Sequence, residues 1–466
     1  MSESPRFDST QVTAEAAVPT RRAKPSRLCA DGDGGRWPPP GPRLPVLAQT
    51  LWWGARPVEM LDTCARRYGD VFRLRLAGGR EFVVVSDPAL TGEIFTADTD
   101  LVRPGVFNWN LDVIFGRTSL PMLDGGAHLR MRRLLLPPFH GEQVARYEQI
   151  MAEIADAEIA TWPHGTPFRL HDRMLELTFR VIMRTIFGVD DEARRASLAE
   201  AFRAVVSAAA PIIFLPGLRH RGGRLGPWAR LERRNAERER LLLEVIAERR
   251  AQLAGGDDQG DVLTLLIKSR HEDGSPMTDH ELSDELKSLL IAGHVTTASA
   301  LAWFFSLVLA RPAVLDRLQA EAAGASTSYL DAVIRESQRL CPPIVHVGRA
   351  ALRTLRLDDW RIPAGTFLVP SIHLVHRRPD IYPEPEQFRP DRFLNVKPAP
   401  YAFIPFGGGP RRCLGASFAH VEMRVAIRAI LRQTELRPMR QRAEQPVRVG
   451  PPVGPRTGTR VISRRR

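Results

Sequence analysis

The stretch Phe406-Gly407-Gly408-Gly409-Pro410-Arg411-Arg412-Cys413-Leu414-Gly415 places one cysteine on a glycine-rich loop, and a helix from Ala416 to about Gln433 is predicted to follow it. The thiolate form of cysteine binds soft metals, and the positive end of a helix and nearby guanidinium groups stabilise its charge. Gly409 and Gly415 allow the backbone to bend closely around the sulfur, so that amide N–H groups can point at it. Phe406 can shield the sulfur from water. The stretch therefore predicts a loop that presents a thiolate to a metal.

The pattern Phe-x-x-Gly-x-Arg-x-Cys-x-Gly in this loop resembles the haem-ligand loop of the cytochrome P450 family, and the resemblance runs from about residue 37 to the end of the chain. It implies a mainly α fold with small β sheets in a single domain, and haem b (iron protoporphyrin IX) as cofactor. Cys413 matches the proximal iron ligand, whose electron donation favours O–O cleavage. A buried free cysteine in a glycine turn is the alternative that the loop alone leaves open.

The chain is strongly basic, with a formal net charge of +13 over 466 residues and a pI near 10.4. Arginine spread along the sequence supplies the excess, since the only lysines are Lys24, Lys268, Lys287 and Lys397. No nucleic-acid-binding module accompanies this charge, so no nucleic acid is expected as a partner. A basic face for an acidic electron-transfer protein is the better use of it.

No C-x-x-C pair occurs among the four cysteines, which are Cys29, Cys64, Cys341 and Cys413. The sequence therefore indicates neither a zinc site nor a disulfide framework, and it fits a reduced compartment such as the bacterial cytoplasm. Residues 1–36 are polar and charged, without an apolar signal or membrane anchor. They are expected to form a disordered tail in front of one domain at 37–466.

The longest predicted helix begins at a capping box of Thr278 and Glu281 and ends before Pro312. Its apolar run Leu289–Leu309 is long enough to span a bilayer, but the polar residues within it favour a helix buried in protein. No Walker loop, dinucleotide-binding fingerprint or nucleophile elbow occurs in the sequence. Other helices and strands are predicted at 57–68, 71–76, 81–85, 329–340, 349–357 and 367–371, with a closing hairpin at 451–458.

Four basic residues match the groups that bind the two haem propionates in the family. His128 and Arg132 are four residues apart and so share a helix face, in a segment that resembles the family's propionate-binding helix. Arg349, just after Pro342-Pro343, and Arg411, two residues before the cysteine, match the other propionate ligands. Bidentate pairing of arginine with carboxylate is the physical reason for these residue types.

Glu336 and Arg339 are three residues apart on a predicted helix, a spacing that by itself is typical of any solvated helix face. The resemblance implies instead a buried charge network with Arg392 that supports the cysteine loop. Such a cluster is stable only when every member is satisfied. These residues are therefore expected to be structural rather than catalytic.

The segment Ala292-Gly293-His294-Val295-Thr296-Thr297 resembles the family's oxygen-side motif, Ala-Gly-x-Asp/Glu-Thr-Thr. Thr296 matches its oxygen-activating threonine, but Val295 stands at the acidic position and cannot pass protons. Either ordered water or a substrate hydroxyl carries the protons, or turnover is slow and leaks peroxide, or the reaction is not ordinary oxygen insertion. We favour the first because Thr296 and every haem-binding element remain. His294 points about 100° around the helix and is expected to face protein or solvent.

Two other regions bear on partners and substrate. The link between Arg311 and Tyr329 is short where the family commonly has a longer helical insert, near the surface that electron donors approach. The apolar segments Asn108–Leu120 and Ala208–Trp228 fall where the family has a lid over the haem and an entrance between helices, so a lipophilic substrate is expected. Ordinary core or loop packing is the alternative explanation of these side chains.

The resemblance implies a monooxygenase that inserts one oxygen atom from O2 into a small lipophilic molecule, for example a terpenoid, fatty acid, steroid or polyketide-like compound. Its electrons would come from a separate ferredoxin or flavodoxin with its reductase, because the fold uses the whole chain. One alternative, motivated by Val295, is a haem-thiolate isomerase, dehydratase or peroxide-driven enzyme. The other alternative is a non-catalytic haem-binding sensor.

Overall fold

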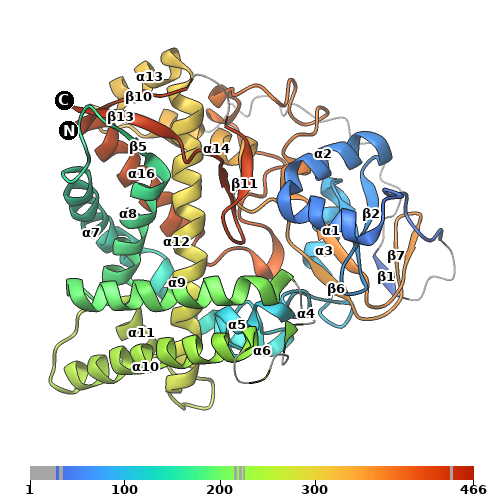
Figure 1. Cartoon of the computed structure of the whole chain (residues 1–466), viewed down its shortest axis with the longest axis horizontal. Coiled ribbons are helices and arrows are strands. Elements are labelled where there is room, and N and C mark those ends of the chain that lie inside the picture. Colours follow the sequence, from blue (N-terminus) through green and yellow to red (C-terminus); the bar gives the residue numbers. More distant parts are fainter. Residues whose placement is uncertain (1–27, 31–34, 215–217, 220–222, 224–225, 441–443) are drawn as a thin grey trace, which may run out of the picture.

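The computed structural model describes residues 28–30, 35–214, 218–219, 223, 226–440 and 444–466. Helices dominate it, and Figure 1 shows them gathered around the long helix α12, with the five-stranded sheet and α1–α3 on the other side of the molecule. The α-helices are α1 (Val46–Ala55), α2 (Pro57–Tyr68), α3 (Pro88–Thr96), α4 (Pro104–Phe107), α5 (Asp112–Phe115), α6 (Gly125–Leu135), α7 (Glu142–Ile159), α8 (Leu170–Thr185), α9 (Glu192–Phe214), α10 (Pro227–Ala254), α11 (Val262–Lys268), α12 (Asp279–Leu309), α13 (Pro312–Ala322), α14 (Ser328–Leu340), α15 (Ile372–Val375) and α16 (Ala416–Gln433). The strands are β1 (Cys29–Ala30), β2 (Val71–Leu76), β3 (Arg80–Val85), β4 (Val102–Arg103), β5 (Pro167–Arg169), β6 (Arg349–Ala351), β7 (Leu355–Leu357), β8 (Trp360–Ile362), β9 (Phe367–Pro370), β10 (Thr434–Pro438), β11 (Pro446–Arg448), β12 (Val453–Pro455) and β13 (Arg460–Arg465).

Helix α12 is the central element of the helical part. The predicted capping box is present at its start: the Glu281 N–H donates to Thr278 Oγ1 over 3.2 Å, and the Thr278 N–H donates to Glu281 Oε2 over 2.9 Å. The residues of α12 from Thr297 to Phe305 are all buried, and the helix packs against α8 and α10. By length and composition α9, over Glu192–Ile213, and α12 could each cross a membrane, but 56% of the most apolar window of α12 is buried inside the protein. This agrees with the predicted core helix.

The largest sheet has the strand order β2-β3-β9-β6-β4, with β3 and β9 parallel and the other neighbours antiparallel. It confirms the predicted strands near 71–76, 81–85 and 367–371. The strand-like segment predicted over 349–357 is confirmed as two short strands, β6 and β7. The chain leaves the sheet after Ala351, where the Leu352 N–H donates to the Leu101 carbonyl, and β7 then pairs with β8 in a different sheet. Apolar periodicity continues through this bend and so does not reveal it.

Two further connections can be compared with the sequence predictions. The short link between Arg311 and Tyr329 contains a helix, because Pro312 at its first turn begins α13, which reaches Ala322. The closing hairpin is formed by β11 and β12, whose turn the Val449 N–H closes by donating to the Pro452 carbonyl. The predicted range 451–458 therefore covers only its second strand, and β13 belongs to another sheet with β10 and β5.

The predicted tail at 1–36 lies mostly outside the described residues. Within it, Cys29 and Ala30 form β1, which pairs with β7, and the Arg36 N–H donates to the Asp359 carbonyl. The domain boundary at residue 37 stays a prediction.

Candidate active site

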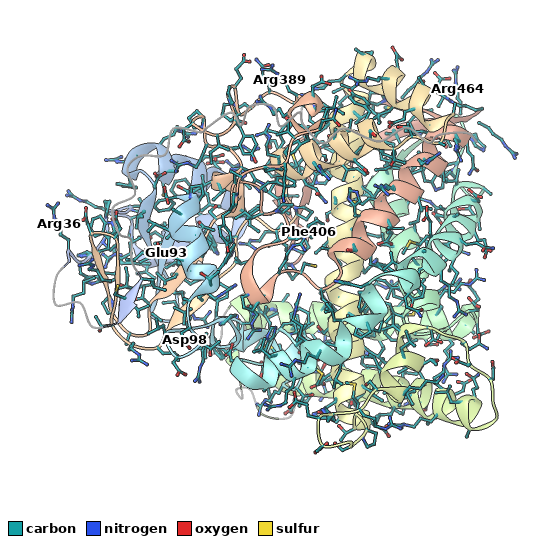
Figure 2. The ribbon with its side chains drawn as sticks, turned by 180° about the vertical axis from the view of Figure 1, so that it is seen from behind. Arg36, Glu93, Asp98, Arg389, Phe406 and Arg464 are labelled. Carbon is teal, nitrogen blue, oxygen red and sulfur yellow. The ribbon has the colours of Figure 1, made fainter. Side chains whose placement is uncertain are left out.

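The cysteine loop lies between the sheet-bearing part and the helical part of the molecule, where Figure 2 labels Phe406 near the centre. The Cys413 N–H donates to the Phe406 carbonyl over 2.9 Å, which closes the loop, and α16 begins at Ala416. The Cys413 side chain is exposed although Leu414 and Ala416 beside it are buried. A reachable thiol at the start of a core helix is suited to bind a ligand.

The two glycines singled out in this loop serve different purposes. Gly409 has φ +64°, and a Cβ there would stand 2.2 Å from the Phe95 carbonyl oxygen, so both its backbone conformation and its packing require glycine. Gly415 has φ −86°, which any residue adopts, and a Cβ there would meet nothing within 4 Å. Glycine at 415 therefore leaves open the space beside the thiol instead of permitting a turn.

The thiolate-stabilising groups expected around Cys413 are present. The Gly415 N–H is hydrogen-bonded to the sulfur, and the charges of Arg132 and Arg412 also lower the pKa of the thiol. The dense protein surroundings of the sulfur, although a small molecule can still reach it, are the larger effect and raise the pKa of the thiol above its usual value. A metal cation would reverse this balance, because a coordinating thiol loses its proton. The surroundings of Cys413 are therefore suited to a thiolate that is bound to a metal.

The four predicted propionate ligands are brought together. Burial, followed by the charges of Arg411, Arg132 and Arg349, lowers the pKa of His128 to about 3. Burial is also the main reason that the pKa values of Arg349 and Arg411 fall to about 10. The charges of three arginines therefore act on one neutral histidine in a poorly solvated region, and the role of these residues as propionate ligands stays a prediction.

Negative charge in this basic cluster is scarce. Arg411 forms an ion pair with Asp124 at 2.6 Å and donates to the Leu120 carbonyl over 3.2 Å. Arg349, only 6% exposed, donates to the Gly348 carbonyl and lies over the Phe95 ring, with no carboxylate paired to it among the described residues. Buried positive charge that exceeds its partners calls for an anionic ligand. The residues present therefore fit a group that carries carboxylates, as haem does.

Helix α12 carries the oxygen-side motif. The Thr296 hydroxyl donates to the Ala292 carbonyl, one turn earlier, and both residues lie in the partly exposed stretch 291–296 that precedes the buried half of the helix. His294 instead faces protein, where its Nδ1 lies 2.9 Å from Thr178 Oγ1. Burial, with a smaller effect of His171, lowers the pKa of His294 to about 4. The prediction that His294 does not replace the missing acid is supported by this position.

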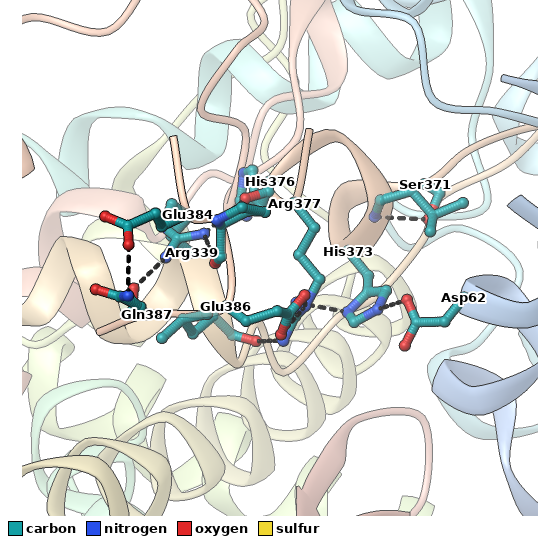
Figure 3. A network of polar contacts seen from close by, with 12 residues as sticks. Asp62, Arg339, Ser371, His373, His376, Arg377, Glu384, Glu386 and Gln387 are labelled. Atoms are coloured by element: carbon teal, nitrogen blue, oxygen red, sulfur yellow. Dashed lines mark hydrogen bonds and ion pairs between the residues drawn. The ribbon is translucent and has the colours of Figure 1, made fainter. Parts of the chain in front are cut away.

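The supporting network of Glu336, Arg339 and Arg392 is present. Arg339 and Glu336, both fully buried, form a bidentate pair at 2.7 and 2.8 Å, and Arg392 Nε approaches Glu336 at 3.6 Å. Arg339 also donates to the carbonyls of His376, Pro385 and Gln387, as Figure 3 shows in part. It thereby fastens α14 to the segment that leads to the cysteine loop.

The structure also reveals a buried carboxyl that sequence reasoning missed. Glu422 on α16 is hydrogen-bonded to the Thr297 side chain, and burial raises its pKa well above the usual value. Its Oε1 has no partner among the described residues. Its spacing from Phe418 and Ala426 places it on the apolar face of α16, a signal that could have found it.

Two acids of α12 hold the predicted lid. The Thr118 N–H and hydroxyl donate to Asp284 Oδ2 over 2.9 and 2.7 Å, and the Leu120 N–H donates to Glu285 Oε1 over 2.7 Å. Part of the lid therefore has a fixed place relative to the oxygen-side helix. The predicted entrance segment 208–228 falls partly outside the described residues.

Comparison with known proteins identifies the family. The cytochrome P450 family model matches residues 38–454. Among curated proteins, the chain is 40% identical over 419 residues to putative cytochrome P450 135B1 of Mycobacterium tuberculosis, covering 88% of this chain and 87% of the relative. It is also 37% identical to putative cytochrome P450 137 of the same species, covering 85% and 83%.

Similar solved structures belong to the same family. Retinoic acid-bound cyanobacterial CYP120A1 matches with a TM-score of 0.80 at 25% identity, covering 92% of this chain and 99% of the other. The cytochrome P450DA heme domain matches with a TM-score of 0.81 at 24% identity, covering 92% and 97%. The chain belongs to the cytochrome P450 family and has its mainly α fold with small β sheets. Haem, iron protoporphyrin IX, is the cofactor of that family and fold.

Proposed function

We propose that this protein is a monooxygenase that inserts one oxygen atom from O2 into a small lipophilic molecule. The observation that carries the proposal is the convergence of the exposed Cys413 thiol, the basic cluster of His128, Arg132, Arg349 and Arg411, and the Thr296 segment of α12. Bound haem supplies the redox-active iron at which dioxygen is activated.

In this proposal, each group of residues has one task. Cys413 would hold the haem iron through its thiolate, with the Gly415 N–H and Arg132 stabilising its negative charge. The basic cluster would hold the propionates through charge-assisted hydrogen bonds and so fix the orientation of the cofactor. Thr296 would offer a hydroxyl to dioxygen. The domain responsible extends over residues 37–466.

Proton supply is the unusual part of the mechanism. Val295 offers no carboxylate, so ordered water or a substrate hydroxyl brings protons to Thr296. Glu422, a buried carboxyl hydrogen-bonded to neighbouring Thr297, is a second proton donor that this arrangement supports. The retained Thr296 speaks against a peroxide-driven enzyme, and against an isomerase or a sensor that never activates dioxygen.

Electrons would come from a ferredoxin or flavodoxin with its reductase, in the cytoplasm. The net charge of +13 supports an acidic partner, because opposite charge speeds the encounter of two proteins. A lipophilic substrate is supported by the apolar residues Val113 and Ile114 of α5, which pack with residues of α9 and α10. Terpenoids, fatty acids, steroids and polyketide-like compounds all have this character, and so does the retinoic acid bound by one structural neighbour.

The test begins with haem-loaded protein titrated with these compound classes while the Soret band is followed. Compounds that shift the iron to high spin are then incubated with a ferredoxin, its reductase and isotopically heavy dioxygen. We expect a product that carries one heavy oxygen atom. Equal product formation with peroxide alone would favour the peroxide-driven alternative, and spectral shifts without any product would favour a sensor.

A further inference from the structure

Arg448 of β11 lies in an apolar environment without a counter-charge. Burial lowers the pKa of its guanidinium to about 10, and no carboxylate pairs with it among the described residues. Its Nε has no hydrogen-bond partner in the described part of the chain, and its one hydrogen bond is a long one, 3.4 Å, to the Trp53 carbonyl. A desolvated arginine with so few partners is costly unless a ligand completes its environment.

A second, half-buried group lies beside it with the same deficiency. His346 stacks at an angle on Trp53, with ring centroids 4.7 Å apart, and Arg448 lies over the same indole at 5.8 Å. His346 Nδ1 is buried and has no partner in the described residues. Burial and the charge of Arg448 lower the pKa of His346 to about 3, so the ring is neutral. Two unsatisfied polar groups thus flank one aromatic ring.

The surroundings of this pair are apolar. Trp53, Phe82, Phe367 and Val453 belong to one buried cluster, and Phe107 packs on it. Phe82 and Phe107 lie 5.8 Å apart, and Phe107 and Phe367 lie 5.3 Å apart, with tilted or edge-on rings. An apolar molecule would therefore find aromatic surface next to a single cation.

The pair also borders the proposed active site. His346 precedes Arg349 of the basic cluster by three residues, and Arg448 is paired across the hairpin with Val453. The Val453 carbonyl accepts from Trp303 Nε1 of α12 over 3.0 Å, and β12 packs against that helix. A Cβ on the next residue, Gly454, would lie 3.6 Å from the Ser299 hydroxyl, one helical turn from Thr296. The hairpin that carries the cation therefore packs against the oxygen-side helix.

We propose that Arg448 and His346 form a subsite that binds the carboxylate of an apolar acid substrate. This inference rests on the proposed monooxygenase function and deepens it by naming the substrate class. The substrate's carboxylate would accept hydrogen bonds from the Arg448 guanidinium and from His346 Nδ1–H, a geometry suited to planar, bidentate recognition. Its apolar body would lie on the aromatic cluster and extend towards Thr296.

The experiment uses haem-loaded wild type and three variants, Arg448→Gln, Arg448→Lys and Arg361→Gln. Arg361 is an exposed arginine of β8 and serves as the matched control. Each protein is titrated with two matched pairs, dodecanoic acid with 1-dodecanol and retinoic acid with retinol. Binding is followed by the Soret shift and independently by tryptophan fluorescence, since Trp53 lies in the subsite.

We expect the wild type and Arg361→Gln to bind each acid roughly tenfold more tightly than its alcohol. Arg448→Gln should lose this preference while still binding the alcohol, and Arg448→Lys should keep part of it because the charge remains. The proposal is overturned if acid and alcohol bind equally to the wild type, if Arg448→Gln keeps the preference, or if no acid binds. A normal reduced carbon-monoxide spectrum in every variant verifies that the haem site is intact.

Failure of the proposed function gives a different result. If the acids bind selectively but are never oxygenated with redox partners present, the subsite stands and the monooxygenase assignment falls. If alcohols are oxygenated as readily as acids and bind as tightly, the assignment stands and the subsite is wrong.

Discussion

At the scale of single residues, the glycine at position 409 combines two requirements that usually occur separately. Its φ of +64° lies in the left-handed region, and its α-carbon approaches the Phe95 backbone so closely that a methyl group has no space. The approach matters because α3, which carries Phe95, packs against the start of the cysteine loop. The position of the candidate ligand thus depends on one missing side chain.

We predict that Gly409→Ala destabilises the protein by more than about 2 kcal/mol, because strain from the positive φ adds to a backbone clash. The measurement is denaturant unfolding of the protein, with haem retention as a second readout. Gly165→Ala is the matched control, since Gly165 has φ +71° but nothing within 4 Å of its would-be Cβ. It should cost only about 1 kcal/mol. Equal losses for both variants would mean that the Phe95 contact is unimportant.

Val295 is the residue that most separates this chain from the usual oxygen-side motif. We predict that Val295→Asp raises the fraction of electrons recovered in product by roughly twofold or more, because a carboxylate can then pass protons to Thr296. Product and peroxide are measured against the electron donor consumed. Val295→Asn, of similar size but unable to titrate, is the control. Unchanged coupling in Val295→Asp would show that the missing acid is immaterial.

At the scale of elements, a fully buried ion pair within α14 joins Glu336 to Arg339, whose hydrogen bonds to carbonyls attach this helix to the segment after α15. Removing one charge leaves the other in a medium that solvates it poorly, so Glu336→Gln should destabilise the protein by about 3–5 kcal/mol. Glu59→Gln provides the comparison, because Arg56 and Glu59 have the same i, i+3 spacing but side chains 67% and 52% exposed. That exposed pair should contribute less than about 1 kcal/mol. Unfolding curves that shift equally would contradict the assigned role of burial.

At the scale of the whole molecule, buried neutral histidines make stability depend on pH. The pKa of His294 is about 4 in the folded protein, against an ordinary 6.5, so the unfolded chain binds a proton first as the pH falls. Stability should therefore decline from pH 6.5 towards pH 4, by up to about 1.4 kcal/mol per pH unit for this histidine. His346 adds to the same decline, since its pKa is about 3.

The check on this prediction is the free energy of unfolding measured across that pH range. His294→Gln keeps a hydrogen-bonding group near Thr178 but cannot titrate, so its curve should be flatter than that of the wild type. The exposed His164→Gln is the control, because both states leave that ring in water. An unaltered slope in His294→Gln would refute the contribution of His294.

Segments that are far apart in the sequence also come together in the whole molecule to form the candidate site. The Asp284 and Glu285 carboxylates of α12 bind backbone N–H groups of the lid, more than 160 residues earlier in the chain, and Arg411 binds carbonyls of that same segment. The lid, the oxygen-side helix and the cysteine loop are therefore mechanically connected. Any movement of the lid must break these hydrogen bonds.

The amino-acid sequence alone determined the features that depend on neighbours within a few residues. The capping box at Thr278, the helix after Cys413 and the glycine-bent loop are all set by local hydrogen bonding and backbone freedom. The polar residues within the apolar run Leu289–Leu309 also predicted that α12 is buried in protein. The members of the basic cluster could be predicted because each of them matches a position in the motifs of the family.

The tertiary structure decided what no local signal encodes. It assigned the two short strands within 349–357 to different sheets, because β6 pairs with β9 whereas β7 pairs with β8. It placed Glu422 against Thr297, and it brought Arg448 to Trp53 across 395 residues of sequence. Such contacts arise when whole elements pack against one another, and the energy of packing does not depend on sequence separation. The sequence therefore specifies which chemical groups a residue carries, whereas the fold determines which other residues it contacts.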